Sequence, residues 1–130
     1  MKVEDIINIK NESIENRIEK AIKETKDELQ DLTTETTCFI YSSILGEHLR
    51  KEHLANEIVS TTEFGYSYEH QFNVVMKNEN TFYLIDLTYS QFQSDKFSEL
   101  LQKGYMLISR EQGREYLDIV GNVNTNKRKI

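Results

Sequence analysis

The chain has 130 residues, about the size of one domain, and its 38% hydrophobic and 29% charged residues are typical of soluble globular proteins rather than of disordered chains. Sixteen basic and twenty-two acidic residues give a net charge of −6, and the basic residues are interleaved with acidic ones. Because nucleic-acid affinity rests on a basic surface that contacts phosphates, we do not expect nucleic acid as a partner. The basic run at residues 126–130 is interpreted as part of a flexible tail, residues 122–130.

The sequence as given carries no sign of export or membrane insertion. No window holds ~18 consecutive apolar residues, and the first residues include acids where a secretory signal needs an apolar core. We therefore expect no membrane partner and a cytoplasmic location, with delivery into a target cell left open. Cys38 is the one cysteine, so the thiol has no internal disulfide partner and is expected to stay reduced and free to react.

Helical spacing dominates the first part of the chain. Residues 3–10 predict a short helix, and apolar residues recurring among Glu and Lys predict a long amphipathic helix over residues 13–31. The polar, β-branched segment that follows is a poor helix interior, although Thr36 or Thr37 can cap a new helix. We expect that helix to cover residues 38–54, which places the thiol in its first turn.

Strand signals follow in the middle of the chain. Residues 56–61 predict a strand, residues 62–69 a loop and residues 68–92 an antiparallel hairpin with its turn at residues 78–80. The stretch carries two ionisable residues, His70 and Asp86, at strand positions where apolar residues are the norm.

The turn decides where these two side chains point. A three-residue turn places Phe72 opposite Asp86 and His70 opposite Thr88, so His70 and Asp86 share one face as diagonal neighbours within reach of each other. A two-residue turn would place them on opposite faces. We expect the helix that begins at Cys38 to cover this face, whose apolar members are Phe72, Val74, Met76, Phe82 and Leu84.

The last third alternates between helix and strand. Residues 95–103 predict a helix capped by Ser94, and residues 105–109 predict a short buried strand. Ser109 and Gln112 have the spacing of a capping box that opens the last helix.

The element order predicts an α+β fold in a single domain over residues 1–121. Its parts would be N-terminal helices over residues 1–32, a core over residues 36–92 and a C-terminal helix–strand–helix unit over residues 94–121. The core would hold a helix with an N-terminal cysteine, packed on a small antiparallel sheet.

Cys38, His70 and Asp86 together predict nucleophilic chemistry. A helix N-terminus favours negative charge and lowers the pKa of a thiol, and a nearby imidazole lowers it further by forming a thiolate–imidazolium pair. A carboxylate bound to the other ring nitrogen holds the imidazole in place. The backbone N–H of Cys38 is a candidate donor to the oxyanion of an acyl intermediate.

The order Cys, His, Asp, with the cysteine opening a helix and the other two on adjacent strands, resembles the transglutaminase-like core of the papain-like superfamily. The segments "TTCFIYSSILGEHLRKEHLANEIVST", "HQF" and "DLT" carry the resemblance, which runs from about Thr36 to Phe92. It implies that Cys38 is the nucleophile, His70 the general base and acid, and Asp86 the orienting carboxylate.

Within that superfamily the chain looks most like papain-fold toxin and effector glutamine deamidases. The resemblance implies acyl transfer at an amide of a protein or peptide substrate, no cofactor and no metal, and a cognate immunity or inhibitor protein as a further partner. Gln30 is a candidate oxyanion donor by analogy with the upstream glutamine of papain-like enzymes. The sequence departs from the family in having no tryptophan and no proline after Asp86.

Other interpretations remain open. A cysteine protease of the same fold differs only in the amine that leaves, and a catalytically inactive papain-like domain would serve as a binding module. Cys38, His70 and Asp86 each have a structural explanation when taken alone, and a structural zinc site would need a fourth ligand. Three tyrosines flank the site and are candidates to line a substrate cleft: Tyr66, Tyr68 and Tyr89.

Overall fold

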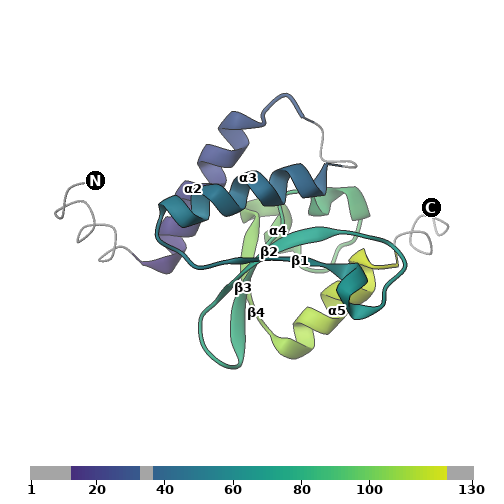
Figure 1. The fold of residues 1–130 in the computed structure, drawn as a ribbon. Helices are drawn as coiled ribbons and strands as arrows, with labels where there is room; N and C mark the ends of the chain where they lie inside the picture. The colour runs from purple at the N-terminus through teal and green to yellow at the C-terminus, as the bar shows by residue number, and fades with distance from the viewer. Residues whose placement is uncertain (1–12, 33–36, 123–130) are drawn as a thin grey trace, which may run out of the picture.

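The computed structural model describes residues 13–32 and 37–122. The chain folds as an α+β protein with a small antiparallel sheet, in agreement with the predicted class (Figure 1). The helix expected at residues 3–10 and the tail from residue 123 lie outside the described residues. The elements in chain order are α2 (Ile14–Glu28), α3 (Cys38–Lys51), β1 (Glu57–Ser60), η1 (Thr61–Phe64), β2 (Gln71–Met76), β3 (Thr81–Ile85), η2 (Tyr89–Phe92), α4 (Ser98–Lys103), β4 (Tyr105–Ser109) and α5 (Arg110–Val120).

Several helix boundaries follow from local capping. The Ser13 hydroxyl accepts a hydrogen bond from the Asn16 amide and opens α2, and Ser109 and Gln112 form the predicted capping box of α5. Thr37 occupies the N-cap position of α3, as expected, although its side chain makes no capping bond. The helices end earlier than predicted, α2 at Glu28 and α3 at Lys51.

The helix α4 begins three residues later than the sequence predicts. Its N-cap is Phe97, which adopts a left-handed conformation with φ 57°, and the helix begins at Ser98. The Ser94 hydroxyl instead accepts a hydrogen bond from the Lys96 amide and closes a turn before the helix.

The sheet is an antiparallel meander with the strand order β1-β2-β3-β4. Val74 pairs with Leu84 and Met76 with Phe82, which is the register predicted from a three-residue turn. The Asn78 side chain closes that turn by accepting from the Asn80 and Thr81 amides. The hairpin therefore directs even-numbered residues of β2 and β3 to one face and odd-numbered residues to the other.

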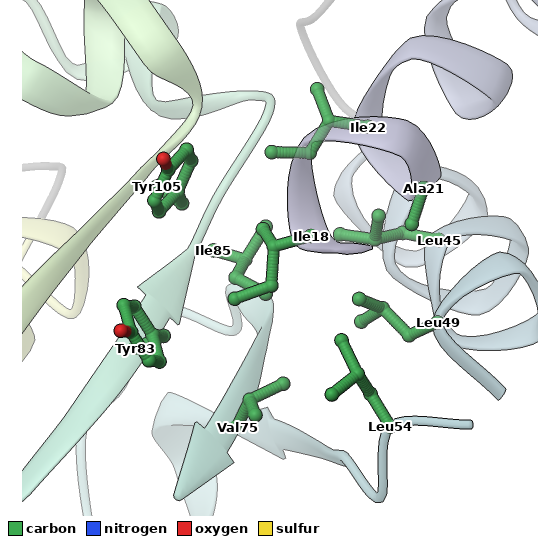
Figure 2. Packing of buried hydrophobic residues seen from close by; sticks show 10 residues of the cluster. All are labelled: Ile18, Ala21, Ile22, Leu45, Leu49, Leu54, Val75, Tyr83, Ile85 and Tyr105. Atoms are coloured by element: carbon green, nitrogen blue, oxygen red, sulfur yellow. The ribbon is translucent and has the colours of Figure 1, made fainter. Parts of the chain in front are cut away.

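One face of the sheet is covered by α2 and α3. Leu45 and Leu49 of α3 point at Val75 and Ile85, and three residues of α2 pack beside them (Figure 2). The Asn73 side chain on the same face donates a hydrogen bond to the Ser42 carbonyl of α3 at 3.0 Å. The further members are Ile18, Ala21, Ile22, Leu54, Tyr83 and Tyr105.

The prediction that the Cys38 helix covers the face of His70 and Asp86 is therefore wrong. The helix α3 lies on the opposite face, and η2, α4 and α5 pack on the face of Phe72 and Leu84. Both faces of the hairpin are apolar, so alternation within the strands could not indicate which helix covers which face.

A buried histidine links α2 and α3. His48 of α3 is 7% exposed, and its two ring nitrogens lie 2.9 and 3.0 Å from carboxylate oxygens of Glu24 and Glu28 on α2. The carboxylates are four residues apart and thus lie on one side of α2.

None of the described helices is long and apolar enough to cross a membrane.

Candidate functional site

Three segment ends bring the predicted triad together. Cys38 is the first residue of α3, His70 immediately precedes β2, and Asp86 immediately follows β3. The hairpin register brings His70 and Asp86 side by side, and the Asp86 amide donates to the Gly104 carbonyl at 2.9 Å, which anchors the end of β3. Cys38 reaches His70 past the end of β2 rather than across the face of the sheet, because α3 covers the other face.

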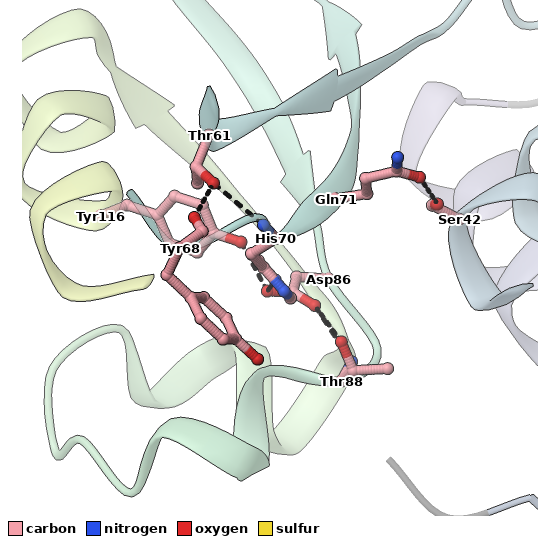
Figure 3. A network of polar contacts seen from close by, with 8 residues as sticks. All are labelled: Ser42, Thr61, Tyr68, His70, Gln71, Asp86, Thr88 and Tyr116. Atoms are coloured by element: carbon pink, nitrogen blue, oxygen red, sulfur yellow. Dashed lines mark hydrogen bonds and ion pairs between the residues drawn. The ribbon is translucent and has the colours of Figure 1, made fainter. Parts of the chain in front are cut away.

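His70 and Asp86 form a buried pair. Nε2 of His70 lies 2.8 Å from Oδ2 of Asp86, and the residues are 0% and 3% exposed (Figure 3). A buried carboxylate and imidazole are costly unless each is bound by the other and by further donors. Hydrogen bonds satisfy both carboxylate oxygens of Asp86 and Nε2 of His70, and leave only Nδ1 of His70 without a partner.

Asp86 accepts hydrogen bonds on both carboxylate oxygens. The Thr88 amide and hydroxyl donate to Oδ1 at 3.0 and 3.1 Å, and the Tyr116 hydroxyl of α5 donates to Oδ2 at 2.5 Å (Figure 3). Burial alone would raise the pKa of Asp86, but the charge of His70 and the donors from His70, Tyr116 and Thr88 lower it below the usual value. Asp86 is therefore a carboxylate at neutral pH.

The backbone and the ring of His70 are both fixed. The His70 amide donates to Oγ1 of Thr61 at 2.9 Å, and the Thr61 hydroxyl donates to the Tyr68 carbonyl. The Phe92 ring meets the imidazole edge to face at a centroid distance of 4.6 Å. These contacts hold the imidazole in one orientation.

The protonation of His70 is set by its neighbours. Burial lowers the pKa of the imidazole, but the charge and hydrogen bond of Asp86, together with the Cys38 thiol, raise it to about 9. His70 is therefore an imidazolium at neutral pH. Its second ring nitrogen, Nδ1, is buried and has no hydrogen-bond partner among the described residues, and the Cys38 thiol lies near enough to raise the pKa of the ring.

Cys38 is half-buried beside that ring. Burial raises the pKa of the thiol, but the His70 imidazole and the Gln71 backbone amide lower it by more, so the net pKa lies below the usual value. The thiol and Nδ1 of His70 do not meet hydrogen-bond geometry, although each of the two groups shifts the pKa of the other. The first backbone N–H groups of α3, which include that of Cys38, have no carbonyl partner within the helix.

The space beside the thiol is narrow. A cavity of about 10 Å³, close to the size of one water molecule, is lined by Cys38, Gln71, Asp86 and Thr88 among others. The Gln71 side chain accepts a hydrogen bond from the Ser42 hydroxyl, one turn after Cys38 in α3 (Figure 3). Phe39, the residue after Cys38, is 54% exposed.

The three tyrosines predicted to line a cleft lie in different places. Tyr68 is close to the site, and its ring packs edge to face against Phe92. The pKa of Tyr68 is raised, mainly by burial and to a smaller extent by the charge of Cys38. Tyr66 packs against the end of α5, where its hydroxyl donates to Asp118. Tyr89 is 1% exposed and donates to the Lys96 carbonyl, so the expectation that it lines an open cleft is wrong.

The sequence does not indicate three residues that contact His70 or Asp86. Thr61 lies in a 3-10 turn, Phe92 ends a second such turn, and Tyr116 occupies a core position of α5, thirty residues from Asp86. The helical spacing of α5 is consistent with a buried Tyr116, but spacing carries no sign of a carboxylate partner.

The zinc interpretation has no support in the geometry. Asp86 binds Nε2 of His70 directly, so these side chains engage each other instead of converging on a common point. Within residues 13–32 and 37–122 no group of three or more His, Cys, Asp and Glu residues is arranged to hold a metal. Gln30, the candidate oxyanion donor, is exposed in the turn after α2.

Comparisons of the chain with protein-family models, with curated proteins and with solved structures gave no match. The chemistry of the site is therefore inferred from its own residues.

Proposed function

We propose that the protein is a thiol-nucleophile enzyme with a papain-like core, which transfers the acyl group of an amide through Cys38. The observation that supports this most strongly is the fully buried His70–Asp86 pair, whose free ring nitrogen is left for the thiol at the start of α3. A structural histidine would need no second contact with a half-buried thiol whose pKa is lowered.

The proposed reaction has two halves. The Cys38 thiolate attacks the carbonyl carbon, and the resulting oxyanion accepts hydrogen bonds from backbone N–H groups at the start of α3. The His70 imidazolium then donates its proton to the nitrogen as the C–N bond breaks, which releases ammonia or an amine and leaves a thioester. Neutral His70 next removes a proton from water, which attacks the thioester and yields a carboxylic acid and the free thiol.

The most concrete substrate is a glutamine side chain on a protein. The resemblance to toxin and effector glutamine deamidases supports this choice, whereas the cavity of about 10 Å³ beside Cys38 has room for only one water molecule and does not distinguish a side-chain amide from a peptide bond. We therefore propose glutamine deamidation of the toxin or effector kind, with a protein substrate and an immunity protein as partners. Peptide-bond hydrolysis by the same residues is the second candidate.

Active-site titration tests the proposal. p-Nitrophenyl acetate should give a burst of about one equivalent of nitrophenolate followed by slower turnover, and intact mass should locate the acetyl group on Cys38. Cys38→Ser should lose the burst, and His70→Gln should lose the turnover. A glutamine-containing peptide then separates the candidates, because a deamidase releases ammonia and leaves the backbone whole.

Two outcomes would contradict the proposal. One is acetylation of Cys38 without turnover in the unmodified chain. The other is turnover that persists in Cys38→Ser. Replacement of Phe39, which lies beside the thiol but outside the triad, offers a matched control: Phe39→Ala should keep the burst and change only the response to peptide substrates.

A further inference from the structure

A second cavity lies away from the thiol, between α5 and the sheet. Its volume is about 500 Å³, within the range of roughly 300–1,000 Å³ that small-molecule sites occupy. We call it the α5 groove and define it by six of its lining residues: Phe64, Val74, Met76, Phe82, Arg110 and Arg114.

The wall of the α5 groove is apolar and open to solvent. Phe64 is 58% exposed and Met76 is 56% exposed, and Val74 and Phe82 are only partly buried beside them. A contiguous group of exposed apolar side chains is typical of a binding site, whereas single exposed apolar residues are common on any protein surface. Removing this surface from water would favour an occupant with an apolar body.

The charge at the groove is opposite to that of the chain. Arg110 and Arg114 are four residues apart and lie on one side of α5, and no Asp or Glu lines the groove although the chain has twenty-two of them. Neither arginine has an ion-pair partner among the described residues. Arg110 also lies in the first turn of α5, where the helix dipole disfavours a cation, so an anion there would relieve an unfavourable charge.

A glycine lies between the two arginines. A Cβ atom at Gly113 would approach the Phe82 ring to 3.0 Å, so the glycine allows α5 to lie close over Phe82. Glycine within a helix costs about 1 kcal/mol relative to alanine, and close packing at the groove offsets that cost.

We propose that the α5 groove binds a single-chain amphiphile with a carboxylate head group. The apolar chain would lie along Val74, Met76 and Phe82, and the carboxylate would accept hydrogen bonds from the guanidinium groups of Arg110 and Arg114. Guanidinium groups suit a carboxylate because their donors match its two oxygens. The size of the cavity favours a small molecule over a protein helix or a membrane surface.

Calorimetric titration with dodecanoate, and with dodecanol as the uncharged analogue, tests the proposal on the whole chain. Dodecanoate should bind the unmodified chain at least about tenfold more tightly than dodecanol, the difference expected of charge-assisted hydrogen bonds. The variant Arg110→Gln/Arg114→Gln should remove that difference and leave dodecanol binding unchanged. Arg50→Gln, on α3, is the matched control and should bind dodecanoate as the unmodified chain does.

A second variant addresses the apolar wall. Met76→Glu places a carboxylate on an exposed wall residue, and the cost of desolvating this carboxylate should weaken both ligands at least about tenfold, with charge repulsion weakening dodecanoate further. Leu101→Glu, at an equally exposed apolar residue of α4, should change neither. Circular dichroism of each variant verifies that the fold is retained.

Three results would overturn the proposal: no binding of dodecanoate, equal binding of dodecanol that is indifferent to the two arginines, or an unmodified chain that light scattering finds to be a dimer and that Met76→Glu makes monomeric. The last result would assign the groove to a contact between copies. No step of the test involves the thiol, so failure here would leave the proposed acyl transfer standing.

Discussion

The two faces of the sheet differ in what they bury. The face under α2 and α3 is mainly aliphatic, with Leu45, Leu49, Val75 and Ile85 in close contact (Figure 2). On the face under α4 and α5, four of the eight buried hydrophobic residues are aromatic, and one end of this face encloses a charged pair and a tyrosine hydroxyl. The same alternating strands build both, so the difference lies in the elements that cover them. The first face buries mainly aliphatic side chains, whereas the second also encloses ionisable groups, whose burial is costly.

Breaking the buried pair should have the largest effect on stability. Asp86→Ala leaves His70 buried without its partner and should lower the free energy of unfolding by about 4 kcal/mol. The double variant His70→Leu/Asp86→Leu replaces the pair with apolar side chains and should recover most of that loss. Urea denaturation of the three proteins measures both values. A double variant as unstable as Asp86→Ala would contradict the idea that the pair is kept for chemistry rather than for stability.

On the aliphatic face, the face under α2 and α3, the most destabilising change is a substitution that leaves a cavity in the core. Leu49→Ala removes a side chain that is 0% exposed and should cost about 3 kcal/mol of unfolding free energy. The reactivity of the Cys38 thiol per folded molecule should not change, because Leu49 lies in the core of α3 away from His70. Ile58→Ala, on an exposed edge-strand residue, is the control and should cost less than about 1 kcal/mol. A fall in thiol reactivity in Leu49→Ala would mean that the two faces are coupled.

The sequence predicts those features of the two faces that depend on residues close together in the chain. The hairpin register, the capping box of α5 and the pairing of His70 with Asp86 depend on neighbouring residues and on one turn, and all three were predictable. The covering of each face was not, because both faces are apolar. The donation from Tyr116 to Asp86 joins elements thirty residues apart, and the left-handed Phe97 at the start of α4 has no local signal.

The charged face should also make stability depend on pH. The pKa of His70 is about 9 in the folded chain and roughly 6.5 in the unfolded chain, so the protonated imidazole favours folding. That contribution is complete below pH ~6.5 and is lost as the pH rises through about 9, at a cost on the order of 3 kcal/mol. Urea midpoints between these pH values measure it. The same series on His70→Gln should lack this decline, and an equal decline in both would assign it to other groups.

The smallest expected effect on stability comes from removing the Tyr116 hydroxyl, which donates a hydrogen bond to Asp86. Tyr116→Phe deletes a hydrogen bond to the Asp86 carboxylate and should cost about 2 kcal/mol of unfolding free energy. It should also raise the pKa of Asp86, weaken the hold on His70 and slow thiol alkylation at neutral pH. Tyr83→Phe is the matched control on the other face, because Tyr83 is a buried residue whose hydroxyl is neither hydrogen-bonded nor buried without a partner among the described residues. Equal effects in the two variants would show that Tyr116 acts through packing alone.

The most direct test of the account is the rate of iodoacetamide alkylation at Cys38 as a function of pH, in the unmodified chain and in His70→Gln. A thiolate–imidazolium pair predicts a reaction already fast near pH ~6 in the unmodified chain and a titration that moves up towards roughly 8.5 in the variant. Peptide mapping would verify that the label is on Cys38. A reaction that titrates near the ordinary thiol value of roughly 8.5 in both proteins would contradict the proposed site and leave Cys38 as a structural residue.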